Sequence, residues 1–356
     1  MKSFWTLATC HLLITATVNA QGVITRIGSD GTHFYYNGQL DSAVAHANLT
    51  TTTDTILLGG GTYSVPTTDL IIEQPIILVG TGPDIDSTAA YGGRTVIDGN
   101  DIFLRDGADS SEFHGLTITS NVFIGEFELN TTDVDHLLFR RCDLQSLRLN
   151  ALMSPGATMA NDVTLDNCVV RTNNLNLNGA ANVILTNSVL KEFNSAANGT
   201  LVEHCLFLNW NLGNGPAGVT FRNNIFANDL CCSASVNGAS TYINNLFVGN
   251  GDDFIVNYGM AVSHDDIDPV GTSLGSVFVN VSSYNQFTYA GDADYHLLSD
   301  WQGLGDDGTD PGPHGGNGWK EGGLPFSPHW RYLNMPASTV NGVLPNVHIK
   351  AGAQEN

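Results

Sequence analysis

A six-residue motif recurs at short intervals through the middle of this chain and limits the folds that the chain can adopt. The motif is an apolar residue, any residue, a polar residue, then Cys, Ser or Asn, any residue, and a second apolar residue. Six copies occupy residues 139–144, 165–170, 185–190, 202–207, 221–226 and 242–247, and a weaker copy occupies 113–118. Successive copies begin 26, 26, 20, 17, 19 and 21 residues apart. A period near twenty with short apolar strands is typical of a solenoid that adds one coil per repeat.

A single coil of this size buries too little apolar surface to fold alone, so the coils must stack as parallel strands about 4.8 Å apart. Stacking in register places Leu165, Leu185 and Phe221 in one interior column. The motif also predicts a row of corner asparagines, because Asn tolerates bent backbone and can hydrogen-bond the backbone or the next Asn in a stack. This row contains Asn167, Asn187, Asn223 and Asn244.

The composition favours an all-β protein and excludes some partners. Hydrophobic residues make up 42% of the 356 residues, which is enough for a sizeable core, and few residues suit long helices. The formal net charge is −22, with 13 Lys and Arg against 35 Asp and Glu. This acidic protein therefore lacks the clustered cations that nucleic acid requires. The charge also disfavours anionic lipid surfaces and tight binding to polyanionic polysaccharides. A bound divalent cation could locally reverse the second of these conclusions.

The chain divides into four segments. Residues 1–20 have the pattern of a secretory signal peptide, with Lys2 before an apolar stretch and a small-residue cleavage site after Ala20. Residues 21–55 are expected to form an N-terminal cap with a short helix from Leu40 to Ala47, for which Asp41 or Ser42 would be the N-cap. Residues 56–260 are expected to form the solenoid, and 261–356 the final strands and an extended tail. No later apolar run approaches the ~20 residues of a membrane span, so we expect a secreted protein, extracellular or at the cell surface.

Two short elements carry a resemblance to a known family. Gly61-Thr-Tyr63 and Gly80-Thr-Gly82, each following an apolar strand, are similar to the opening coils of pectate-lyase-like proteins. The resemblance covers about residues 50–250 and implies an all-β fold: a right-handed parallel β-helix with a short N-terminal helical cap and an extended C-terminal tail. The glycine- and aspartate-rich run over 294–316 is similar to the C-terminal segment of many secreted β-helix proteins, which packs along or over the final coils. No catalytic subfamily is matched, because Gly251-Asp-Asp253 reproduces only one polygalacturonase element.

The second residue of each motif is expected to point outward, because side chains alternate along a strand. These residues form a column of mixed charge on one sheet: Arg140, Asp166, Thr186, Glu203 and Arg222. One interpretation is a ladder of exposed ion pairs, each contributing about 0–1 kcal/mol. The other is the floor of a sugar-binding groove, which makes Arg140, Asp166, Glu203 and Arg222 the candidate substrate-binding residues.

Two further groups of residues admit two interpretations each. Cys142 and Cys168 occupy the same motif position on adjacent coils, so they could form a disulfide or belong to a column of small buried thiols that also contains Cys205. The acidic residues Asp265, Asp266 and Asp268 could bind calcium through carboxylate oxygens, or could simply form a solvated turn.

We therefore expect a carbohydrate-binding protein whose lateral face binds, and if catalytic processes, an extracellular polysaccharide or cell-surface glycan. An enzyme of this kind would be a polysaccharide lyase or a glycoside hydrolase, using a calcium-assisted base or a carboxylate pair. Lys191, Arg171 and Arg222 are the candidate bases. The alternative is a non-catalytic structural or adhesive protein of a surface or matrix, with the solenoid as a rigid spacer.

Overall fold

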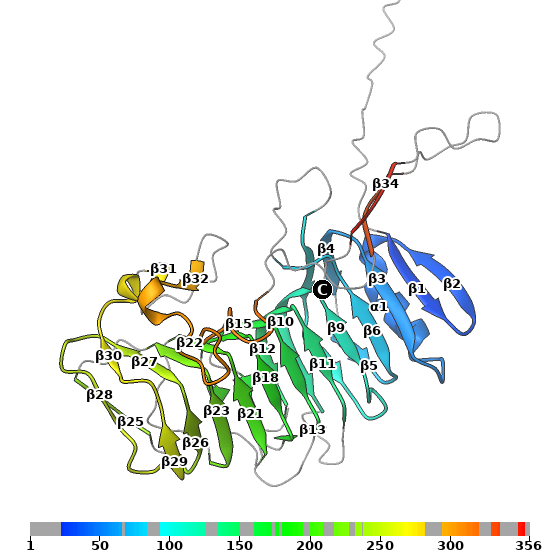
Figure 1. Cartoon of the computed structure of the whole chain (residues 1–356). Helices are drawn as coiled ribbons and strands as arrows, with labels where there is room; N and C mark the ends of the chain where they lie inside the picture. The colour runs from blue at the N-terminus through cyan, green and yellow to red at the C-terminus, as the bar shows by residue number, and fades with distance from the viewer. Residues whose placement is uncertain are drawn as a thin grey trace, which may run out of the picture.

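The computed structural model shows a parallel β-helix that runs from the blue N-terminal cap to the yellow final coil in Figure 1. A pectate-lyase-like solenoid was predicted, and its stacked parallel strands are observed. The structure describes residues 23–65, 68–83, 93–125, 134–149, 160–172, 175–177, 180–191, 193–194, 199–208, 217–227, 232–236, 238–281, 294–319, 329–334 and 348–352. The predicted signal peptide lies outside these residues.

The first long sheet, sheet A, takes one strand from each coil. Its twelve strands follow one another in space in the order β2 (Gly31–Tyr35), β1 (Ile24–Gly28), β3 (Asp54–Leu58), β6 (Ile76–Val79), β9 (Glu112–His114), β11 (Leu138–Arg140), β14 (Thr164–Asp166), β18 (Ile184–Thr186), β21 (Thr200–Glu203), β23 (Val219–Arg222), β26 (Thr241–Ile243) and β29 (Ser263–Asp265). From β3 onward every pairing is parallel, whereas β2, β1 and β3 pair antiparallel.

The second long sheet, sheet B, takes the strand that follows each corner. Its main path is β4 (Gly61–Val65), β7 (Thr95–Gly99), β10 (Thr117–Ile124), β12 (Asp143–Arg148), β15 (Val169–Val170), β19 (Val189–Leu190), β22 (Leu206–Leu208), β24 (Ile225–Ala227), β27 (Leu246–Gly249) and β30 (Val270–Gly271). Two side branches leave this path: β5 (Leu70–Ile72) pairs with β8 (Ile102–Leu104), which pairs with β10, and β20 (Phe193–Asn194) pairs with β16 (Leu175–Asn176), which pairs with β12.

The remaining elements are small. Four two-stranded sheets pair β13 (Ala160–Asn161) with β17 (Ala180–Ala181), β25 (Ser233–Ser235) with β28 (Ile255–Asn257), β31 (Phe278–Asn280) with β32 (Asp294–Leu297), and β33 (His329–Asn334) with β34 (His348–Gly352). Short 3-10 turns occupy Asn37–Gln39, Leu274–Ser276 and Ser299–Trp301. In the described part of the chain, no helix is long and apolar enough to cross a membrane.

The N-terminal cap contains the predicted helix, α1 (Leu40–Ala47), whose Leu40, Ala43, Val44 and Ala47 are buried against the first coil. The predicted N-cap is wrong by two residues or more, because Gln39 precedes the helix and Asp41 lies in its first turn. The hairpin of β1 and β2 was not predicted. A buried ion pair, in which Arg26 Nε donates to Asp54 Oδ2 at 2.6 Å, ties this hairpin to β3.

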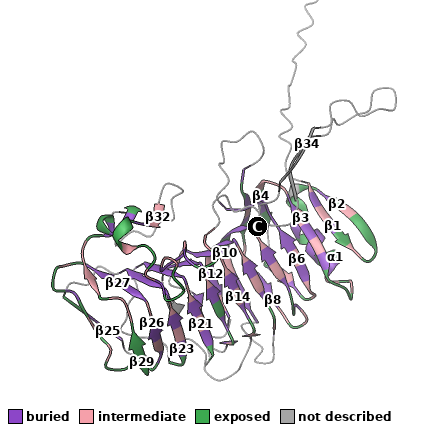
Figure 2. Ribbon diagram, viewed as in Figure 1, coloured by how far each residue is buried: buried purple, intermediate pink, exposed green. Residues whose placement is uncertain are grey.

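The interior consists of columns of equivalent side chains, as the motif predicted. The register pairs Phe139 with Leu165, Leu165 with Leu185, and onward to Phe221. All of these side chains are fully buried, and Figure 2 shows the purple strands that carry them. On sheet B, Phe207, Phe226 and Phe247 stack face to face, with ring centroids 4.9 and 4.8 Å apart. Burying these columns is the main source of stability, at about 25 cal/mol for each Å² of apolar surface removed from water.

The corner between the two sheets differs from the prediction in one respect. The corner asparagines do adopt the predicted bent backbone, with φ of 56° at Asn167 and 54° at Asn223. The ladder of stacked polar side chains, however, is formed by the next residue of the motif. Asn224 Nδ2 donates to Asn245 Oδ1 at 2.9 Å, and Asn245 Nδ2 donates to Asp266 Oδ1 at 2.8 Å. These inward amides satisfy backbone groups that the tight corner leaves without a partner.

The outer face of sheet B is covered by the segment after the solenoid. Val169, Val189, Leu206, Ile225 and Leu246 are all buried there. They pack in one cluster with residues of the segment that contains β31 and β32, including Phe278, Tyr295 and Leu297. This explains why the fifth motif position is apolar from the second copy onward, and it places the C-terminal segment over the final coils, as the resemblance implied.

Candidate functional site

The outward column on sheet A exists as predicted. The register aligns Arg140 with Asp166, Asp166 with Thr186, Thr186 with Glu203, and Glu203 with Arg222. Its charges pair along the column: Arg140 Nε lies 2.9 Å from Asp166 Oδ2, and Arg222 Nη1 lies 3.2 Å from Glu203 Oε1. All five residues are half-buried, so the column forms a polar surface of fixed geometry.

A strap, residues 303–317, lies across the corners next to this column, and it is drawn in orange over the green coils of Figure 1. Asn187 Nδ2 donates to the carbonyls of Pro313 and Gly315, at 3.0 and 2.7 Å. Asn223 donates to Asp306 Oδ1 at 2.8 Å and accepts from the Asp306 amide at 3.0 Å. The corner asparagines therefore have a second role beyond their backbone conformation, because their amides hold the strap.

The strap and the column border an open pocket of about 370 Å³. Sheet A and its corner supply one wall and the strap supplies the other. Glu203 and Asp307 contribute two carboxylates from opposite walls, and the other lining residues are Thr186, Asn187, His204, Thr309, Gly316 and Asn317. A concave site with a few fixed polar groups at its wall is the usual form of a small-ligand or sugar site.

His204 connects the two walls. It occupies a corner position with φ of 50° and is almost fully buried. Its Nε2 lies 3.1 Å from Asp307 Oδ2, and its Nδ1 lies 3.2 Å from the carbonyl oxygen of Asp310. Both neighbours are hydrogen-bond acceptors, so they orient the ring and leave it little freedom.

The strap carboxylates are held in their ionised form. Partial burial by itself would raise the pKa of Asp307, but hydrogen bonds from the Thr309 amide and hydroxyl, together with His204, outweigh it and lower the pKa below the usual value. The pKa of Asp306 is also lowered, because hydrogen bonds from Arg222 and Asn223 outweigh its desolvation. The pocket therefore carries negative charge over the ordinary pH range.

Only some of the predicted substrate-binding residues lie at the pocket. Glu203 lines the pocket, while Arg222 lies beside it and is shared between Glu203 and Asp306, 2.9 Å away. Arg140 and Asp166 lie further along the same column and do not line the pocket. They remain candidates for a longer groove that continues from the pocket along sheet A.

The predicted calcium residues are not grouped. Asp265 and Asp268 are exposed, whereas Asp266 is half-buried at the end of the asparagine ladder. Burial raises the pKa of Asp266 and so disfavours the ionised form that a metal needs. The described residues contain no group of three or more His, Cys, Asp or Glu that could hold a metal ion.

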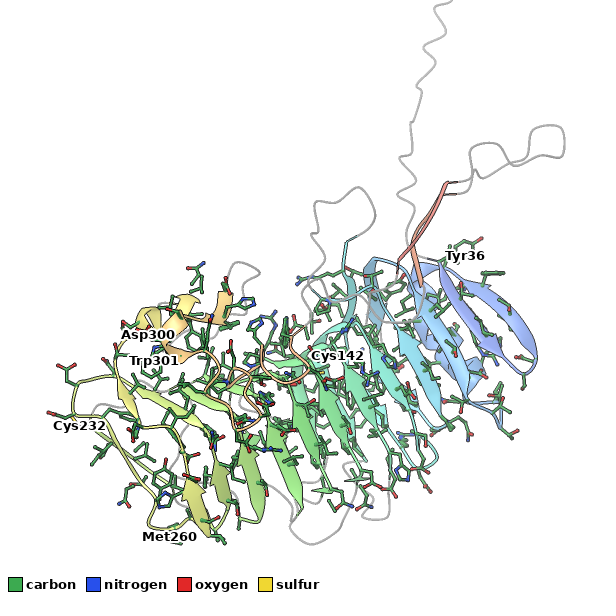
Figure 3. The ribbon with its side chains drawn as sticks, viewed as in Figure 1. Tyr36, Cys142, Cys232, Met260, Asp300 and Trp301 are labelled. Carbon is green, nitrogen blue, oxygen red and sulfur yellow. The ribbon has the colours of Figure 1, made fainter. Side chains whose placement is uncertain are left out.

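The disulfide considered between Cys142 and Cys168 is not formed, and the alternative of buried thiols is observed. Both are free, as is Cys205, and all three are fully buried; Figure 3 labels Cys142 within the solenoid. The Sγ atoms of Cys142 and Cys168 each lie 3.3 Å from a carbonyl oxygen of the preceding coil. Burial raises the pKa of the Cys168 thiol, and it raises the pKa of the Cys205 thiol to about 12, which disfavours the reactive thiolate at these two positions. Cys232, at the far end, is disulfide-bonded.

The sequence prediction missed the strap side of the pocket. Asp307 and Thr309 belong to the glycine- and aspartate-rich run that was expected to pack along or over the final coils. His204 was interpreted only as the polar residue of its motif. One signal was available in the sequence: His204 is an imidazole at a motif position where the other five copies have Asn or Arg.

The comparison with known families agrees with this fold. Residues 26–264 match the model of the family described as rhamnogalacturonase A/epimerase, pectate lyase-like. This match covers more than half of the chain, and the protein therefore belongs to that family of pectate-lyase-like parallel β-helix proteins. No individual curated protein matches it. The strap lies beyond residue 264, so one wall of the pocket comes from outside the matched segment.

Proposed function

We propose that this protein is exported and binds an extracellular polysaccharide or cell-surface glycan on the lateral face of its solenoid. The pocket between the strap and the outward column carries the proposal, because it places hydroxyl, amide and carboxylate groups around a space of about 370 Å³. The column continues the polar surface through Asp166 and Arg140, which suits an extended chain of sugars. The family is consistent with a polysaccharide-related role.

The test is binding to a panel of neutral, acidic and amino polysaccharides by the mature protein and by Thr186→Tyr. Thr186 projects from the outer face of β18, so a tyrosine there fills the pocket without entering the core. Thr164→Tyr is the matched control, because Thr164 projects from the same sheet but lies outside the pocket. We expect Thr186→Tyr to abolish binding and Thr164→Tyr to preserve it. Absence of binding to the whole panel would favour the structural or adhesive alternative.

Glycoside hydrolysis is a second candidate, favoured by the pair of carboxylates at the pocket wall. Asp307 is ionised and could act as the nucleophile or base opposite Glu203. A lyase receives less support, because two of its candidate bases are held in ion pairs: Arg171 with Asp143 at 2.6 Å and Arg222 with Asp306. Release of reducing ends that disappears in Asp307→Asn would support hydrolysis. Unsaturated products that depend on calcium, removed by a chelator, would support a lyase instead.

A further inference from the structure

At the pocket wall, most hydrogen-bond donors are already bonded within the protein, whereas the carboxylate acceptors are not saturated. Both hydrogens of the Asn187 amide are donated to strap carbonyls, and the Thr309 hydroxyl is 2.8 Å from Asp307 Oδ1. The Thr186 hydroxyl lies 3.3 Å from Asp166 Oδ1, and the Gly316 amide donates to Thr309 Oγ1 at 2.7 Å. The donors at this wall are thus largely committed to the protein, while carboxylate oxygens keep accepting capacity, since each can accept more than one bond.

The charged residues at the pocket also favour a ligand that donates hydrogen bonds and carries positive charge. Glu203 and Asp307 line it, and Asp306 lies next to them. The nearest arginine, Arg222, contacts both Glu203 and Asp306, and its pKa is raised chiefly by the bond to Asp306. His204 points its two nitrogens at acceptors of the strap. An anionic sugar would therefore meet carboxylates without an uncommitted arginine or lysine at the described wall, whereas a cation would be attracted.

We propose that the pocket selects a sugar that carries a protonated amine, such as a glucosamine unit, and rejects uronate units. This inference rests on the proposed function, since it names the substrate class of that site. An ammonium group supplies three donors and a positive charge, which complement accepting oxygens on Glu203 and Asp307. A uronate carboxylate has neither property, and the net charge of −22 adds long-range repulsion.

The experiment compares three tetrasaccharides by calorimetry at a pH where the glucosamine amine is protonated. The probes are tetramers of glucosamine, of N-acetylglucosamine and of galacturonic acid, measured at low and at high salt. We expect the glucosamine tetramer to bind tightest, with an affinity that falls as salt rises. Glu203→Gln should weaken glucosamine binding by about tenfold and leave the N-acetylated probe nearly unchanged.

Glu112→Gln is the matched control, because Glu112 projects from strand β9 of the same sheet and lies outside the pocket. It should leave all three affinities unchanged, and the melting temperature of each variant verifies its fold. Tight binding of the galacturonic acid tetramer, or glucosamine binding that Glu203→Gln does not alter, would overturn this inference. If a neutral or acidic glycan from the panel binds at least as tightly as the glucosamine tetramer, and Thr186→Tyr abolishes that binding, the proposed function stands while the amine selectivity fails. Binding of no glycan at all removes both.

Discussion

At the scale of single residues, the corner position of the motif determines both the local chain path and the site. Asn167, Asn187, His204, Asn223 and Asn244 all adopt positive φ, between 44° and 56°. Asn visits this region more readily than most residues, because its short amide can hydrogen-bond locally. Where the strap is present, the same amides turn outward and bind it. Asn at this position therefore has two roles, bending the backbone at the corner and binding the strap. The repeat in the sequence does not show which asparagines have the second role.

Substitutions at Asn223 should separate these two roles. Asn223→Ala loses the left-handed preference, at about 1 kcal/mol, and also loses both hydrogen bonds to Asp306. Asn223→Gly keeps the backbone freedom but loses the same bonds. We expect similar loss of strap protection in both variants by hydrogen exchange, and a lower free energy of unfolding for Asn223→Ala than for Asn223→Gly. Asn182→Ala is the control, because Asn182 has φ of 54° at an exposed corner and no strap contact in the described structure. Full strap protection in Asn223→Gly would contradict this role.

At the scale of elements, the strap is the part of the fold that makes the pocket, and its attachment is polar. It is held by the corner amides, by the ion pair of Arg222 with Asp306, and by the contact of His204 with Asp307. Polar contacts of this kind contribute only modest net free energy each. The strap should therefore open before the solenoid unfolds, and pocket formation should depend on pH.

Acid should release the strap. The folded pKa values of Asp306 and Asp307 are lowered, so their contribution to docking is fully present above the unfolded value near pH 4 and is lost as pH falls through the lower folded values. We expect amide exchange at the strap, corrected for intrinsic rates, to rise below about pH 4 while the interior columns stay protected. Asp306→Asn should reduce this pH dependence, and Asp252→Asn, in an exposed turn, should not. If the exchange protection of the strap amides stayed the same from pH 6 to below about pH 4, the ionic attachment of the strap would be disproved.

At the scale of the whole molecule, each coil of the solenoid packs against its neighbouring coils along one axis. The cap with Tyr36 and the final coils with Cys232 and Met260 lie at opposite ends in Figure 3. Each interior side chain contacts its equivalents above and below, so a defect in one coil weakens two interfaces. The strap and the β31–β32 segment add contacts that cross several coils, and they join the last part of the solenoid to the remainder of the chain.

Removal of one aromatic ring from the sheet B column should show this dependence. Phe226 stacks between Phe207 and Phe247 and is buried. We expect Phe226→Ala to lower the free energy of unfolding by about 3–5 kcal/mol, measured by urea denaturation. Thr241→Ala on the outer side of sheet A should change it by less than about 0.5 kcal/mol. An effect of Phe226→Ala no larger than that of Thr241→Ala would show that the column does not hold the coils together.

The coils, their register and the outward column could all be predicted from the amino-acid sequence. Those features repeat, and equivalent residues about twenty positions apart become direct neighbours, so a pattern visible along the chain is also a pattern in space. Leu165, Leu185 and Phe221 lie in one file because each must bury the same face against the same kind of neighbour.

The position of the pocket could not be predicted from the sequence, because it depends on how distant segments meet in the folded chain. His204 and Asp307 are 103 residues apart in the sequence, and no periodicity connects them. The same holds for Asn187 and the strap carbonyls, which lie more than 120 residues away. Contacts of this kind depend on where a non-repeating segment folds back onto the solenoid. The position of that segment is determined by many weak polar bonds together with the apolar residues that it packs against the outer face of sheet B. The solenoid is therefore encoded locally, whereas its candidate site exists only once the chain has closed over it.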